Sequence, residues 1–198
     1  MSRISRPFSR SVIAGDEVAD RTRSAIHVCS LSALADTVAA SRARHVMTLI
    51  NPETFPDTPQ GVHPDRHLKI GMHDIVEVVD GMVAPSDEHV VELLEFVGAW
   101  DRQAPLVVHC WAGISRSTAA AFITACAVVP AASETDIAAR LRQLSVTATP
   151  NRRLVSLADD VLGRQGRMVD AVDAIGPGRA SPIGVPFVLD LFDLHSDV

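Results

Sequence analysis

An almost unbroken apolar run in the middle of the chain leads into a short loop that contains a glycine and an arginine. The run is Leu106–His109 (LVVH), and the segment from Cys110 to Ser117 reads CWAGISRS. A strand without alternation of apolar and polar residues is typical of a parallel sheet that is covered on both faces. Because Thr118–Val128 reads as an Ala-rich helix, we expect a central strand, a tight loop and a helix in direct succession.

Strand and helix patterns alternate elsewhere along the chain. They predict three further strands and four further helices, at Ala25–Leu31, Arg44–Ile50 and His67–Met72 for the strands, and at 32–41, 86–100, from Ser133 and from Asn151 for the helices. Helices are expected to follow the last of these strands. The predicted fold class is α/β, a single domain with a central, mostly parallel twisted sheet of four to five strands flanked by helices.

The two ends of the chain differ in composition from its middle. Residues 1–24, rich in Arg and Ser, are predicted to form an N-terminal arm, residues 25–165 the main domain, and residues 166–198 a C-terminal helix and tail. Within the tail, GPGRASPIGVP from Gly176 reads as a linker or surface arm. The FVLDLF run that follows it either docks as a strand or stays loose.

Charge and cysteine content limit the partners of this chain of 198 residues. Its net charge is -6, which provides no basic surface for nucleic acid or for an anionic membrane, and it has no run of 18 apolar residues. We therefore expect neither a nucleic-acid partner nor a membrane partner. Three cysteines make no even disulfide set, which favours a reducing, cytoplasmic location.

The loop after the apolar strand is predicted to bind an anion. Gly113 allows successive N–H groups to turn inward, and the N-terminus of the following helix adds donors and a positive dipole. Arg116 offers two parallel N–H groups to two phosphoryl oxygens. The same field favours the thiolate form of Cys110, which can then attack phosphorus.

The segment His109–Ser117 (HCWAGISRS) resembles the Cys-(x)5-Arg signature of the protein tyrosine phosphatase superfamily, and most closely its dual-specificity branch. KIGMHD before the long helix is similar to the family's general-acid loop, and Pro150-Asn151 to a Pro-Asn pair that follows the signature. The resemblance covers roughly residues 26–162. It implies that residues 25–165 are a phosphatase-like catalytic domain that works without a cofactor or metal.

The resemblance also implies a role for individual residues. Cys110 would be the nucleophile that forms a cysteinyl-phosphate, and Arg116 would hold the phosphoryl oxygens. Asp74 would protonate the leaving oxygen and then activate water. Asp80 is the reserve candidate for this acid, and Asp87 a weaker one because it suits the first turn of a helix.

Other residues of the signature would support this chemistry. Ser117 would donate a hydrogen bond to the thiolate, and His109 would support the loop from behind. Asn151 would brace the loop, cap a helix, or do both. The phosphate-binding residues would be Trp111, Ala112, Gly113, Ile114, Ser115 and Arg116. Trp111 is either a wall facing the substrate or a packing residue.

Two other groups of residues have simpler readings. Cys29 and Cys126 are expected to be small buried side chains, with a protective disulfide between Cys29 and Cys110 as a minor alternative. A metal site is not expected from the histidines upstream of the acid loop, because a proline breaks any helix that would align them: His63, His67 and His73.

These features predict a phosphomonoester hydrolase that acts on protein phosphotyrosine, with phosphoserine and phosphothreonine as further substrates. Two alternatives stay open: a catalytically silent module that binds phosphopeptides, and a phosphatase for a non-protein substrate such as an inositol phosphate. The stretch WAGIS between Cys110 and Arg116 has no lysine for extra phosphates, which disfavours the latter.

Overall fold

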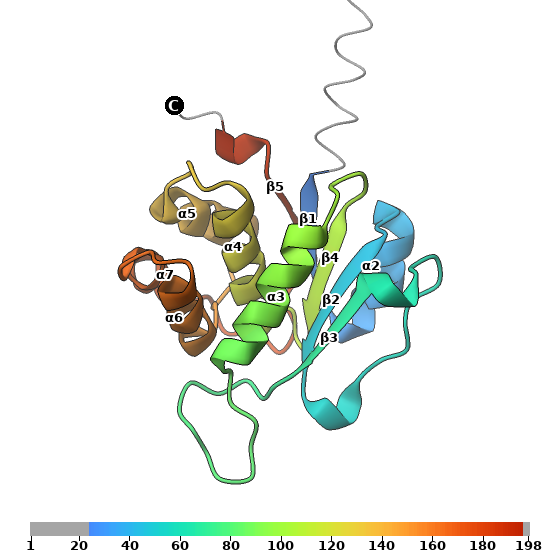
Figure 1. The fold of residues 1–198 in the computed structure, drawn as a ribbon, viewed down its shortest axis with the longest axis horizontal. Helices are drawn as coiled ribbons and strands as arrows, with labels where there is room; N and C mark the ends of the chain where they lie inside the picture. The colour runs from blue at the N-terminus through green and yellow to red at the C-terminus, as the bar shows by residue number, and fades with distance from the viewer. Residues whose placement is uncertain (1–23, 196–198) are drawn as a thin grey trace, which may run out of the picture.

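The structure is a computed structural model that describes residues 24–195 (Figure 1). At its centre lies a five-stranded sheet in the order β3-β2-β4-β1-β5. The strands are β1 (Ala25–Ser30), β2 (His45–Ile50), β3 (His67–Gly71), β4 (Leu106–Cys110) and β5 (Phe187–Asp190). β4 is the middle strand and runs parallel to both of its neighbours, β1 and β2. The central apolar run is therefore the central strand.

Helices cover both faces of the sheet. Residues 24–195 contain six α-helices: α2 (Leu34–Ser41), α3 (Asp87–Ala99), α4 (Arg116–Val128), α5 (Glu134–Leu144), α6 (Arg152–Val161) and α7 (Arg167–Ile175). Short 3-10 segments span Leu31–Ala33, Pro52–Thr54, Pro64–Arg66 and Asp193–His195. Figure 1 shows α2 on one face and the other five helices on the opposite face.

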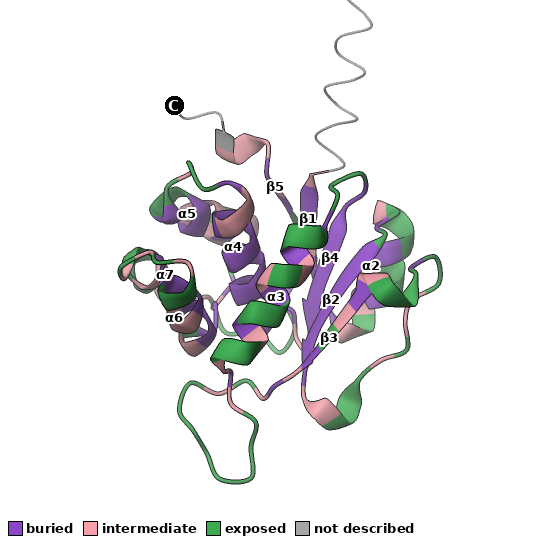
Figure 2. Cartoon of the chain, in the orientation of Figure 1, coloured by how far each residue is buried: buried purple, intermediate pink, exposed green. Residues whose placement is uncertain are grey.

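β4 is apolar because it contributes to two cores. Leu106 and Val108 belong to the large core under α3–α7, whereas Val107 packs with Val38 of α2 on the other face. Every residue of β4 is buried (Figure 2). Burial on both faces removes the need for alternation, as expected for a covered parallel strand.

α4 is also buried on nearly all sides. Every residue from Arg116 to Cys126 is buried, because the helix lies between the sheet and its neighbouring helices. The small side chains of this Ala-rich helix allow close packing on several faces at once. It begins two residues earlier than predicted, because the Ser115 carbonyl already accepts the Ala119 N–H at 2.9 Å.

The predicted α/β class with a mostly parallel sheet is confirmed. Of the two possibilities predicted for the FVLDLF run, docking as a strand is the one that the structure has. Residues 187–190 form β5, which pairs antiparallel with β1 and buries Leu189. The apolar side chains of this run alternate, and the edge of the sheet at β1 is open to pairing. The run therefore pairs with β1 as a strand.

The two ends of the chain, residues 1–23 and 196–198, lie outside the described residues. The predicted N-terminal arm, residues 1–24, lies outside the described residues except for Ser24. Within 24–195, no helix combines the length and apolarity needed to cross a bilayer.

Candidate active site

The loop between β4 and α4 places Cys110 directly beside the start of a helix. Cys110 is the last residue of β4, and Arg116 is the first residue of α4. Between them, Gly113 has φ +73°, and a Cβ atom there would lie 2.8 Å from the Cys29 carbonyl carbon and the Ser30 nitrogen. Only glycine combines this backbone conformation with such close packing against β1.

Two donors surround the Cys110 sulfur. The Gly113 N–H donates to Sγ at 3.3 Å, and the Ser117 hydroxyl lies 3.2 Å from it. The cysteine is 1 % exposed, at the N-terminal end of α4. A backbone N–H, a hydroxyl and the positive end of the α4 dipole therefore lie together around this sulfur.

Arg116 is held over the loop with one of its donors unused. Its Nη1 donates to Asn51 Oδ1 at 2.9 Å and to the Met72 carbonyl at 2.6 Å. Its Nε is buried and has no hydrogen-bond partner among the described residues. A buried N–H without a partner is costly, so this atom marks the place where an anion would bind.

Asp74 is the acid that the fold brings to this loop. Its Oδ1 accepts hydrogen bonds from the Ser115 hydroxyl at 2.6 Å and from Asn151 Nδ2 at 2.9 Å. Its Oδ2 lies 3.9 Å from Arg116 Nε, and the side chain is 37 % exposed. One oxygen is thus fixed while the other faces the arginine.

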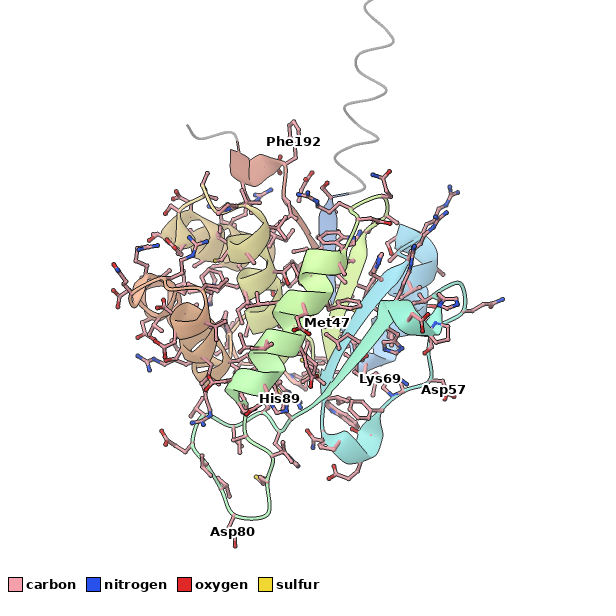
Figure 3. All side chains as sticks on the ribbon, in the orientation of Figure 1. Met47, Asp57, Lys69, Asp80, His89 and Phe192 are labelled. Carbon is pink, nitrogen blue, oxygen red and sulfur yellow. The ribbon has the colours of Figure 1, made fainter. Side chains whose placement is uncertain are left out.

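The two rival acids lie elsewhere. Asp80 is exposed at the tip of a loop that projects from the domain, where its side chain points away from the sheet (Figure 3). Asp87 is the first residue of α3, as its helix-starting pattern predicted. Of the three acids, Asp74 is the one that contacts the signature loop, through Ser115 and Arg116.

The start of α6 braces the loop from the other side. The Thr149 N–H donates to the Ile114 carbonyl at 2.9 Å, and the Asn151 N–H to the Ser115 carbonyl at 3.3 Å. Asn151 Oδ1 also accepts the Leu154 N–H at 3.1 Å. Asn151 therefore caps the helix and holds Asp74 with the same side chain.

Comparisons with known proteins agree with this geometry. Residues 70–147 match the family model described as protein-tyrosine phosphatase. The expected resemblance to the protein tyrosine phosphatases is confirmed. No curated protein matches the sequence.

Solved structures of dual-specificity phosphatases share the fold. DUSP15 is 18 % identical with a TM-score of 0.52, covering 76 % of this chain and 89 % of its own. Human DUSP28 is 18 % identical with a TM-score of 0.52, covering 71 % and 94 %. The Yvh1 phosphatase domain from Chaetomium thermophilum is 17 % identical with a TM-score of 0.52, covering 72 % and 93 %. These structures show the shared fold, and the family match over residues 70–147 supports phosphatase activity in general.

His109 directly precedes Cys110 and the loop of residues 111–115, which we call the phosphatase loop after the family match. It is fully buried, its Nε2 lies 2.6 Å from Thr48 Oγ1, and its Nδ1 lies 3.4 Å from the Cys110 carbonyl oxygen. Burial lowers the pKa of His109 to about 4. The imidazole is therefore neutral at pH 7 and suited to holding the loop.

An apolar cleft opens beside the phosphatase loop. It has a volume of about 550 Å³ and is lined by Asp74, Ser115 and Asn151, and by apolar side chains that include Ile75, Val76 and Val79. Trp111 lies in the same loop and is 59 % exposed.

Sequence reasoning missed several partners of the phosphatase loop. Asn51 and the Met72 carbonyl hold Arg116, and the Gly184 N–H donates to the Ala112 carbonyl at 2.8 Å. The position of Asn51 just after a predicted strand was a usable signal, because the carboxyl ends of parallel strands meet at one edge. For Gly184, the local pattern contains no comparable signal.

The remaining cysteines and histidines lie apart from the phosphatase chemistry. All three cysteines are free, and burial raises the pKa of Cys29 to about 11 and of Cys126 to about 12. The histidines upstream are spread out: His63 caps a 3-10 segment, His67 lies in β3, and the His73 ring accepts the Val83 N–H. The described residues hold no cluster of metal-ligating side chains.

Proposed function

We propose that this chain hydrolyses phosphomonoesters of proteins, with phosphotyrosine as its main substrate and phosphoserine and phosphothreonine as further ones. The observation that supports this most is the buried Nε of Arg116, which makes no hydrogen bond to any described residue, beside a cysteine whose sulfur contacts the Gly113 N–H and the Ser117 hydroxyl. Together they provide a positive slot for a phosphoryl group and a nucleophile at its base.

The reaction would proceed in two steps. In the first, the Cys110 thiolate attacks phosphorus, the ester P–O bond breaks, and Asp74 gives its proton to the leaving oxygen. In the second, Asp74 as carboxylate takes a proton from water, which attacks the cysteinyl-phosphate and releases inorganic phosphate and the thiolate. Ser117 would stabilise the departing sulfur through its hydroxyl.

Backbone donors of the loop would hold the phosphoryl oxygens that Arg116 does not reach. Residues 111–115 connect the end of β4 to the start of α4, so their N–H groups lie around the helix N-terminus. Such an arrangement binds anions without lysine. The proposal needs neither a metal nor a cofactor, and we keep the expected cytoplasmic location on the basis of the three free thiols.

Protein substrates fit the surroundings of the slot better than inositol phosphates. Apolar side chains, among them Val76 and Val79, line the adjacent cleft, and both are exposed. Such a wall suits an aromatic ring or a peptide segment. A substrate with many phosphates would instead meet the carboxylates of Asp74 and Glu77, which also line it.

The test is hydrolysis of a phosphotyrosine peptide in EDTA by the wild type and by variants. Cys110→Ser should abolish turnover, whereas Cys126→Ser, a remote buried thiol, should keep it. Asp74→Asn should lower kcat by roughly 10²–10⁴-fold, the usual contribution of a general acid. Asp80→Asn compares the rival acid directly.

Each other outcome selects an alternative. A larger loss with Asp80→Asn than with Asp74→Asn would reassign the acid. An inert wild type that still binds the phosphopeptide would identify a silent binding module. Faster turnover of an inositol phosphate than of any phosphopeptide would overturn the assignment of protein substrates.

A further inference from the structure

Behind the phosphatase loop, four side chains form one continuous line of hydrogen bonds across the sheet. Thr48 Oγ1 lies 2.6 Å from His109 Nε2 and 2.8 Å from His67 Nε2. His67 Nδ1 then lies 2.9 Å from Thr58 Oγ1. The line starts in β4 beside Cys110, crosses β2, reaches β3 and ends in the loop between β2 and β3.

Only one assignment of donors and acceptors along this line satisfies all four contacts. The Cys110 carbonyl oxygen can only accept, so its neighbour His109 Nδ1 must carry the proton. His109 Nε2 is then an acceptor and takes the proton of the Thr48 hydroxyl. The Thr48 oxygen accepts from His67 Nε2–H, and His67 Nδ1 accepts from the Thr58 hydroxyl.

The reverse direction fails at the end nearest the nucleophile. It would place the lone pair of His109 Nδ1 against the lone pairs of the Cys110 carbonyl at 3.4 Å. It would also leave a fully buried carbonyl contact without a proton, which is unfavourable away from water. The Cys110 carbonyl therefore requires the proton on His109 Nδ1, and the Thr48 hydroxyl supports this tautomer by donating to Nε2.

The inner part of this line is buried and carries no charge. Thr48 and His109 have no exposed surface, and His67 is 8 % exposed. Burial lowers the pKa of His67 to about 4, with Lys69 and His109 adding smaller effects in the same direction. Both rings are neutral at pH 7, as the single direction of donors requires.

We propose that Thr48, His67 and Thr58 are positioning residues that fix the tautomer of His109 and, through its bond to the Cys110 carbonyl, the geometry of the phosphatase loop. The inference rests on the proposed function, because it matters for catalysis only if Cys110 is the nucleophile. It assigns to the loop between β2 and β3 a role in the chemistry, although that loop contributes no reacting group.

A second contact links the same loop to the phosphatase site. Asn51, the first residue after β2, accepts a hydrogen bond from Arg116, and Thr58 lies further along that loop. One segment therefore holds both the phosphate-binding arginine and, through four hydrogen bonds, the carbonyl of the nucleophile. A change at Thr58 reaches Cys110 through the sheet rather than through the cleft.

The variant that tests the line is Thr48→Val, with Thr48→Ser as the rescue. Valine removes the hydroxyl, so His109 Nε2 loses the donor that supports its Nδ1-protonated tautomer. The ring is then held less firmly against the Cys110 carbonyl, which loosens the donors around the Cys110 sulfur. We expect kcat to fall on the order of tenfold, with KM little changed, as for the loss of one buried orienting hydrogen bond. The pH profile of Cys110 alkylation by iodoacetamide should shift to higher pH, and Thr48→Ser should restore both.

The matched control is Thr124→Val. Thr124 is buried in α4, and its hydroxyl donates only to the Ala120 carbonyl at 2.7 Å. The substitution changes the same atoms outside the line and should leave kcat and the alkylation profile as in the wild type. Cys29 and Cys126 stay silent in this assay because burial keeps both thiols protonated.

A measurement on the wild type decides the proposal independently of turnover. Nitrogen-15 NMR of the histidine rings should find His109 protonated at Nδ1 and His67 at Nε2. The opposite tautomers would overturn the proposal, as would a Thr48→Val protein indistinguishable from Thr124→Val in both assays. If the wild type hydrolyses no phosphomonoester, the proposed function is wrong. The histidine tautomers and the alkylation profile still test whether this line of hydrogen bonds positions Cys110.

Discussion

At the scale of single residues, Gly113 is the position in the site that tolerates a side chain least. It combines a left-handed backbone with contact to the backbone of β1, and both depend on the missing side chain. The Gly113 N–H also donates to the Cys110 sulfur. A shift of this residue therefore moves a donor away from the nucleophile as well as straining the loop.

We expect Gly113→Ala to lower the free energy of unfolding by roughly 2–4 kcal/mol, from the left-handed backbone and the overlap with rigid main-chain atoms. The control is Gly163→Ala, since Gly163 has φ +64° but nothing within 4 Å of a Cβ atom. It should show only the smaller backbone penalty. Urea unfolding measures both values, and equal losses would contradict the packing argument.

At the scale of elements, the start of α6 joins helix capping to the positioning of an acid. Asn151 is 4 % exposed and accepts from Leu154 N–H through its oxygen while donating to Asp74 through its nitrogen. Serine at this position keeps a capping oxygen but is too short to reach Asp74. The two functions of the side chain can therefore be separated.

We predict that Asn151→Ala costs about 1 kcal/mol of stability through the lost cap. Its kcat should fall by about tenfold or more, because Asp74 loses one of its two hydrogen-bond donors. Asn151→Ser should regain most of the stability but not the kcat.

Ser133→Ala is the matched cap variant. Ser133 caps α5 by accepting the Asp136 N–H at 3.3 Å, and no contact links it to the phosphatase loop. It should lose similar stability with full activity. A kcat loss in Ser133→Ala, or full activity in Asn151→Ala, would refute the link between the cap and the acid.

At the scale of the whole molecule, the fold buries three histidines in one sheet: His45, His67 and His109. The pKa values of His67 and His109 are both lowered to about 4 by burial. In the unfolded chain, histidine has its ordinary pKa near 6.5. Between these values the unfolded state binds more protons, so stability falls as pH decreases through this window.

The stability of the wild type should therefore decrease from pH 7 to pH 4.5 by an amount on the order of 3 kcal/mol per buried histidine. Below pH 4 this contribution should level off, since both states then carry the proton. His67→Gln removes one titrating ring, and its stability should depend less steeply on pH over the same range. Urea unfolding at several pH values measures the two slopes, and identical slopes would disprove the assignment.

The fold also brings the C-terminal segment against the phosphatase loop. After α7 the chain returns as β5 along β1, and on the way the Gly184 N–H binds the Ala112 carbonyl. A Cβ atom at Gly184 would lie 2.9 Å from the Gly113 carbonyl oxygen, so the segment is in close contact with the phosphatase loop. The C-terminal region thus belongs to the surroundings of the site.

Local chemistry allowed much of this protein to be predicted from its sequence. The apolar run of β4 and the helix after it follow from burial and periodicity, and the spacing of Cys110 and Arg116 from the geometry of a loop at a helix start. Asp74 could be named as the acid, although Asp80 could not be excluded. The predictions of the elements are confirmed because each depends on residues that are close together in the sequence, whereas the role of Asp74 stays a prediction.

The tertiary structure alone decided which distant groups meet at that loop. Asn51, the Met72 carbonyl, Thr48 and Gly184 contact it from other strands or segments, and their local patterns name no partner. The same holds for β5, whose short run became a strand only because β1 offered a free edge. Sequence determines the local elements through short-range sterics and burial, whereas strand order and register determine which polar groups become hydrogen-bond partners.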